Sequence, residues 1–116
     1  MADLAAVEAR LRRILEPYRG RLETATIYGI PTLRRPGAKA HDWFAFVKPA
    51  SKHVGFHLLP IHTWPDLVAS VSPGLGKRLT GKSTFTFKAL DEAEMSELDE
   101  LVARAYERYM ADAAEG

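Results

Sequence analysis

The sequence contains no cysteine at any of its 116 positions. The chain therefore has no thiol nucleophile, thiolate metal site or disulfide bond. The first residues carry an acid, Asp3, where a secretory signal would carry a base. No apolar run approaches the roughly 20 residues of a membrane span. These absences are compatible with a reducing compartment, and we predict a cytoplasmic protein that makes no membrane contact.

Acidic residues are scarce in the middle of the chain. Between residues 24 and 90 only Asp42 and Asp66 accompany nine Lys or Arg, a balance of +7. Residues 91–116 hold nine acids against two Arg, a balance of −7. We interpret this as an acidic last helix beside a basic sheet and its loops. A nucleic-acid surface would need the basic groups on one face with exposed aromatic side chains between them, so nucleic acid is not the expected partner.

The length of the chain fits a single domain, residues 1–116. A chain of this size buries roughly two thirds of its unfolded surface, so neither a metal nor a cofactor is needed to hold it together. No internal repeat, low-complexity tract or linker interrupts the sequence. We therefore treat the chain as one folding unit.

Residues 42–59 predict a central β-hairpin, because two β-rich runs flank a polar break at residues 49–51. We expect Lys48 to face Lys52, which sets Trp43 opposite His57. Alternation then gives one apolar face that must be covered and one mixed face. The predicted apolar face contains Phe44, Phe46, Val54, Phe56 and Leu58. The predicted mixed face contains Trp43, Ala45, Val47, His53, Gly55 and His57.

Two long helices are predicted at the ends of the chain. Apolar residues recur at helical spacing over residues 3–18, where Pro17 would stop or kink the helix. A second helix is expected over residues 91–112, with Asp91 as N-cap and Glu94 three residues on, as in a capping box.

Shorter elements are predicted between these helices. We expect a strand over residues 32–34. Pro31 makes a position in a central strand unlikely for the residue before this strand. A short helix is expected over residues 62–71 and a strand over residues 84–88, where Thr and Phe alternate. The predicted fold is α+β, in the order α-β-β-β-α-β-α, with the helices packed on one face of an antiparallel sheet.

The string from Gly76 to Ser83 matches the Walker A pattern literally. That pattern holds phosphate only when a strand precedes the loop and a helix follows it, because the free N–H groups of the helix bind the phosphate. Here the β-like run 84–87 follows instead. We interpret the string as a basic turn before a strand. A weak phosphate or nucleic-acid contact through residues 77–82, which include Lys77, Arg78 and Lys82, remains an alternative.

The sequence does not predict an enzyme. No serine lies in a nucleophile-elbow pattern, and few acids are available before residue 91 to orient a histidine. His53 and His57 stand four apart, which on a strand separates them by roughly 13 Å. A metal site of His57 with His62, or of His41 with His57, is conceivable, but His57 beside Trp43 and His53 at the surface is the preferred interpretation.

The sequence resembles the YdhG-like family of bacterial domains of unknown function. The resemblance rests on the YGIPT segment at 28–32, the Phe-rich hairpin that ends in HLLP at 57–60, and the GKSTFTF strand at 81–87 before a terminal helix. It covers nearly the whole chain and implies a frataxin-like two-layer fold, with iron binding or delivery as an extension. Frataxins carry an acidic first helix, whereas the first helix here is rich in arginine.

Two functional hypotheses follow from these residues. The first is a non-enzymatic module that binds a protein or small molecule on the open face of the sheet. Its candidate residues are Tyr28, Trp43, His53, His57, Thr84 and Thr86. The second is the iron binding that the resemblance implies, through the oxygen ligands that iron prefers. Its candidate ligands are Asp91, Glu92, Glu94 and Glu97.

Overall fold

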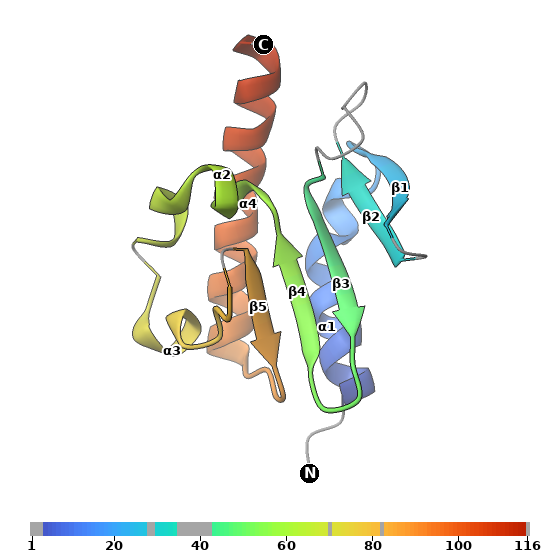
Figure 1. The fold of residues 1–116 in the computed structure, drawn as a ribbon, viewed down its shortest axis with the longest axis vertical. Coiled ribbons are helices and arrows are strands. Elements are labelled where there is room, and N and C mark those ends of the chain that lie inside the picture. Colours follow the sequence, from blue (N-terminus) through green and yellow to red (C-terminus); the bar gives the residue numbers. More distant parts are fainter. Residues whose placement is uncertain (1–3, 28–29, 35–42, 70, 82, 116) are drawn as a thin grey trace.

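An antiparallel sheet of five strands, in the order β1-β2-β3-β4-β5, forms the centre of the computed structural model (Figure 1). The structure describes residues 4–27, 30–34, 43–69, 71–81 and 83–115. The predicted α+β class and antiparallel sheet are confirmed. The strands are β1 (Glu23–Ile27), β2 (Ile30–Arg34), β3 (Ala45–Pro49), β4 (Val54–Leu58) and β5 (Thr84–Phe87). The helices are α1 (Leu4–Leu15), η1 (Glu16–Tyr18), α2 (Pro60–Thr63), η2 (Pro65–Val68), α3 (Pro73–Gly76) and α4 (Glu92–Glu115).

The element order is longer than the sequence predicted. Strand β1 was not expected, because only two of its five residues, ETATI, are apolar. Strand β2 begins at Ile30 and contains Pro31, so it starts two residues before the expected strand over 32–34. Pro31 pairs with Thr26 of β1, while the register with β3 covers only Thr32 and Leu33. The proline is therefore tolerated, because it lies beyond the part of β2 that has a partner on both sides.

The predicted short helix over 62–71 is divided. Helix α2 ends at Thr63, and the 3-10 helix η2 begins at Pro65. Between them Trp64 has φ −126° and ψ 78°, which is outside the helical region. The cause is local, because the ring of a proline disfavours the helical conformation in the residue before it.

The register of the central hairpin differs from the prediction. Lys48 faces Gly55 and Phe46 faces His57, and the Ala50 N–H donates to the His53 carbonyl across the turn at 2.9 Å. The turn is thus centred between Ser51 and Lys52 rather than on Ala50. In each observed pair the two residue numbers add up to 103, whereas in the predicted pairs they add up to 100. Because these sums differ by an odd number, the side chains of β3 lie on the opposite faces from those predicted.

The exchange changes which side chains of β3 enter the core. Ala45 and Val47 lie opposite Leu58 and Phe56 and are buried under the helices. Phe46 lies beside His57 on the opposite face, so its assignment to the apolar face was wrong. Phe44 precedes β3 and is fully buried, as predicted.

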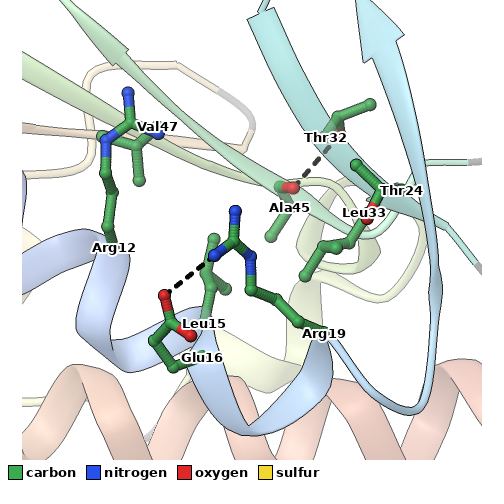
Figure 2. A pocket seen from close by; sticks show the side chains of 9 residues that line it. All are labelled: Arg12, Leu15, Glu16, Arg19, Thr24, Thr32, Leu33, Ala45 and Val47. Atoms are coloured by element: carbon green, nitrogen blue, oxygen red, sulfur yellow. Dashed lines mark hydrogen bonds and ion pairs between the residues drawn. The ribbon is translucent and has the colours of Figure 1, made fainter.

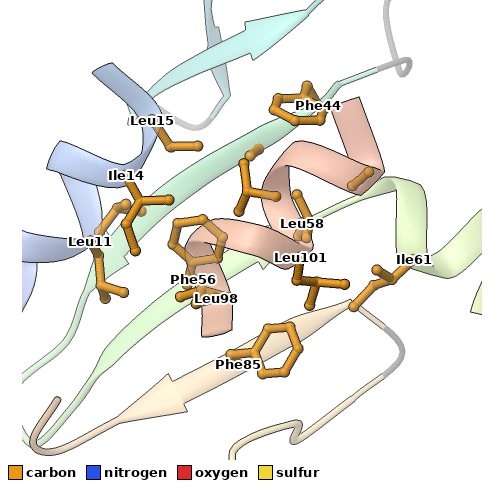
Figure 3. Close-up of a cluster of buried hydrophobic side chains, with 14 of the residues drawn as sticks. Leu11, Ile14, Leu15, Phe44, Phe56, Leu58, Ile61, Phe85, Leu98 and Leu101 are labelled. Atoms are coloured by element: carbon orange, nitrogen blue, oxygen red, sulfur yellow. The ribbon is translucent and has the colours of Figure 1, made fainter. Parts of the chain in front are cut away.

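The core fills the space between the sheet and the two long helices (Figure 3). Most of its largest fully buried side chains come from both helices and from strands β4 and β5. They include Leu11, Phe56, Leu58, Phe85, Phe87, Leu98 and Leu101. The predicted capping box of α4 is present, since the Glu94 N–H donates to Asp91 Oδ1 at 2.7 Å. Within the described ranges no helix is long and apolar enough to cross a membrane.

The outer edge of β5 is paired with the chain that precedes it. The Thr86 N–H donates to the Arg78 carbonyl at 2.7 Å, and the Thr80 N–H donates to the Thr84 carbonyl at 2.9 Å. Leu79 forms an isolated antiparallel bridge with Phe85. Residues 78–80 therefore form a short edge segment that covers the outer side of β5.

Candidate functional site

Both long helices lie behind the sheet in the view of Figure 1, so the opposite face of the sheet is free of them. Side chains that alternate with the buried ones project from this open face. Two rows of residues lie next to each other across β3, β4 and β5. The first is Phe46–His57–Thr84 and the second is Lys48–Gly55–Thr86. Together with the neighbouring Thr80 we call these seven residues the open-face cluster.

The first row is fixed by two contacts of His57. Its imidazole stacks on the ring of Phe46, with 4.3 Å between the centroids and an angle of 8° between the planes. Its Nδ1 lies 3.0 Å from the hydroxyl of Thr84. A stacked pair of this kind contributes about 0.5–1.5 kcal/mol beyond the area it buries. The imidazole is therefore held in one orientation.

His57 is neutral at neutral pH. Burial lowers the pKa of its imidazole below the usual 6.5, and the positive charge of Lys48 in the adjacent row lowers the pKa further. The neutral ring has one nitrogen that donates and one that accepts a hydrogen bond. The cluster thus presents polar groups but, apart from Lys48, no charge.

Gly55 makes room for the imidazole. A Cβ atom at this position would lie 3.3 Å from His57 Nε2 and 3.5 Å from the Lys48 carbonyl oxygen. The first of these contacts is tighter than most real Cβ contacts, so any side chain at position 55 pushes against the ring. The absence of a side chain at Gly55 is therefore part of the geometry of the cluster.

The third contact within the cluster joins two hydroxyl groups. Thr80 Oγ1 and Thr86 Oγ1 are 2.8 Å apart, and Thr80 Oγ1 also lies 3.4 Å from the Thr84 carbonyl oxygen. These bonds connect the edge segment 78–80 to β5. They align a row of three threonines beside the imidazole.

Three of the predicted site residues come together here, namely His57, Thr84 and Thr86. His53 lies at the end of the hairpin, directly before β4, and is partly exposed. Tyr28 lies outside the described residues. Phe46 was missed as a site residue. The run from Phe44 to Val47 is apolar throughout, so it shows no alternation from which the faces of the strand could be assigned.

Trp43 was predicted opposite His57, and this placement was wrong. Phe46 occupies that position, whereas Trp43 lies before β3, at the end of the sheet near α2. There it lines a cleft of about 160 Å³ together with Trp64 and with residues of α2 and α4. The other lining residues are Leu59, Pro60, His62, Thr63, Tyr109 and Asp112.

The four acids proposed as iron ligands lie at the start of α4, and three of them contact protein groups. Asp91 caps the helix, and Glu94 forms an ion pair with Arg78 at 2.7 Å. Glu97 accepts hydrogen bonds from the hydroxyl and the N–H of Ser72, both at 2.6 Å, and these bonds lower the pKa of its carboxyl. Glu92 is exposed. In the part of the chain that is described, no three His, Asp or Glu side chains are grouped to hold a metal ion.

The Walker-like string does not have the surroundings of a nucleotide loop. Strand β5 follows it, as predicted, in the place where a phosphate-binding helix would begin. Lys77 is exposed, and Arg78 lies against Glu94 and over the ring of Phe87, 6.0 Å from its centroid. Lys82 lies outside the described residues. Arg78 thus has a structural role that links the edge segment to α4.

No family model, curated protein or solved structure matches the chain. The resemblance to the YdhG-like family therefore stays a prediction from the sequence.

Proposed function

We propose that the chain is a non-enzymatic binding module that holds a protein partner on the open-face cluster. The observation that carries the proposal is the stacked pair of Phe46 and His57 on the face of the sheet opposite the helices. Phe46 is buried beneath this face, with 7% of its surface exposed, so the half-buried imidazole of His57 provides the contact area together with the hydrogen-bonding groups, a combination typical of protein interfaces. A sheet face is flat, and it fits a folded surface better than a small ligand, which binds in concave sites.

The surroundings of His57 favour binding over catalysis. The hydroxyl of Thr84 beside an imidazole forms the first two parts of a hydrolytic triad. In such a triad a carboxylate orients the imidazole and stabilises its positive charge. Here the neighbouring charge is Lys48, which lowers the pKa of the imidazole and so opposes protonation. The pair therefore works as a rigid polar contact.

Site-specific photocrosslinking tests this proposal. Lys48 is exposed on the open face and Arg13 is exposed on α1 behind the sheet. Each is replaced in turn by the photoreactive p-benzoylphenylalanine, and the purified chain is irradiated in an extract of the source organism. We expect one discrete adduct from position 48 and a different pattern from position 13. An adduct of twice the mass of the chain would identify the partner as a second copy.

Competition makes the experiment specific for the cluster. An excess of unlabelled wild-type chain is expected to suppress the adduct from position 48. The variant Thr63→Arg changes an exposed residue of α2 and should compete as well as the wild type. The variant Thr86→Arg, which places a long charged side chain in the cluster, should not. Equal competition by both variants, or no adduct from position 48, would overturn the proposal.

A further inference from the structure

A cavity of about 70 Å³ lies on the other side of the sheet, between η1 and strands β1, β2 and β3 (Figure 2). It is separate from the open-face cluster, because its inner wall belongs to the face that carries the core. Its lining residues are Arg12, Leu15, Glu16, Arg19, Thr24, Thr32, Leu33, Ala45 and Val47.

The cavity follows from the way α1 ends. Helix α1 packs against β3 and β4, and the chain then turns through η1 into β1. Pro17 lies in the first turn of η1, so α1 cannot continue past the edge of β3 to cover β1 and β2. The space beneath these two strands is left to the side chains around it.

The inner wall of the cavity is apolar. Leu15, Leu33, Ala45 and Val47 are all buried, with exposed fractions of 7% or less. Thr32 is also among the lining residues, but it pairs with Phe46 of the opposite face, and its hydroxyl donates to the Ala45 carbonyl at 3.1 Å. The buried part of the wall thus suits an aliphatic group, and the exposed Thr24 adds a hydroxyl to the lining.

Two arginines, each paired with a glutamate, lie at the mouth of the cavity. Figure 2 shows the side chains of Arg12, in α1, and Arg19, directly after η1, extending toward the sheet. Arg12 pairs with Glu8 at 2.7 Å and Arg19 pairs with Glu16 at 3.0 Å. Both arginine side chains keep 40% or more of their surface exposed. Exposed pairs of this spacing contribute little to stability, so a ligand carboxylate can take the place of either glutamate.

We propose that this cavity binds a short aliphatic carboxylate, with its hydrocarbon part against the apolar wall and its carboxylate between Arg12 and Arg19. An apolar cavity of about 150 Å³ accommodates benzene, so a space of half that size suits about three or four aliphatic carbons. Guanidinium groups bind carboxylates through paired hydrogen bonds, which matches the two arginines at the mouth. The ligand class is that of 3-methylbutanoate.

NMR titration of the ¹⁵N-labelled chain with 3-methylbutanoate tests the proposal. We expect saturable shifts in the millimolar range at the amides of Leu33, Ala45 and Val47. Acetate has the same charge without the hydrocarbon part, and 3-methylbutanamide has the same shape without the charge. Each should bind at least tenfold more weakly. Binding of either compound as tight as that of 3-methylbutanoate would overturn the proposal.

Two arginine variants provide the matched comparison. Arg19→Gln should weaken the binding of 3-methylbutanoate about tenfold, whereas Arg13→Gln, on an exposed position of α1 outside the cavity, should leave it unchanged. Ala45→Leu fills the cavity and should abolish binding. If that variant does not fold, the two arginine variants decide alone. An equal effect of both, or no saturable shift in the wild type, would refute the site.

Discussion

Replacing Phe44 by alanine should destabilise the chain more than a typical core substitution. Its side chain is fully buried, and its ring contacts three tyrosines from two elements. The centroid of Phe44 lies 5.7 Å from that of Tyr18 in η1, 5.9 Å from that of Tyr106 and 5.4 Å from that of Tyr109, both in α4. One ring thus connects η1, the start of β3 and the last helix.

The expected loss follows from these contacts. Truncation of a buried Phe to Ala costs about 3–5 kcal/mol. A chain of 116 residues has a total stability of roughly 6–17 kcal/mol at about 0.05–0.15 kcal/mol per residue. With an unfolding entropy of about 2.1 cal/mol/K per residue, the loss corresponds to a decrease in Tm of roughly 12–20 °C. The substitution therefore removes a large share of the stability.

Urea denaturation followed by circular dichroism measures this loss, with Tm as a second observable. Phe44→Leu keeps most of the apolar volume but loses the ring contacts, so it should cost less than Phe44→Ala. Lys88→Ala, on an exposed residue after β5, should change the free energy of unfolding by less than about 0.5 kcal/mol. A cost below about 1 kcal/mol for Phe44→Ala would show that the ring does not connect these elements.

Three further substitutions test the cluster and the helix cap. Gly55→Ala should displace the imidazole by a few tenths of an ångström, so the ring resonances of His57 should shift in NMR spectra; unchanged resonances would contradict the observed packing. Because the pKa of His57 is lowered in the folded state, its contribution to stability is complete above about pH 6.5 and is lost as the pH falls through the folded-state pKa. His57→Gln should therefore flatten the dependence of the free energy of unfolding on pH in this range, and an unaltered slope would argue against the burial of the ring. Asp91→Ala removes the bond to the Glu94 N–H and should cost about 0.5–2 kcal/mol in urea denaturation; a neutral result would mean that the cap does not stabilise α4.

The fold class was predictable from the sequence because several local signals agreed. The terminal helices, the capping box of α4 and the alternating strand β5 all lie close to their predicted positions. The hairpin register was not predictable, since the turn could be centred on Ala50 or between Ser51 and Lys52. A change of one residue in the turn reverses the faces of β3, and an apolar run cannot reveal which face is buried.

The candidate site was predictable only on strands with clear alternation. His57, Thr84 and Thr86 alternate with buried residues on β4 and β5, so their common face followed from the sequence. Phe46 was assigned to the wrong face together with the rest of β3. The cavity beside Arg19 depends on where α1 ends relative to the sheet, and such a tertiary arrangement leaves no local pattern.

The edge segment formed by residues 78–80 affects how the protein can associate. A strand at the border of a sheet normally offers unpaired N–H and C=O groups that can recruit another chain into a growing sheet. On β5 the outward groups of Thr84 and Thr86 are already bonded to Thr80 and Arg78. Fibrillar growth through this border would first have to detach the segment. Addition of a foreign strand is thereby directed to β1, where Glu23 and Arg34 place opposite charges next to the exposed border.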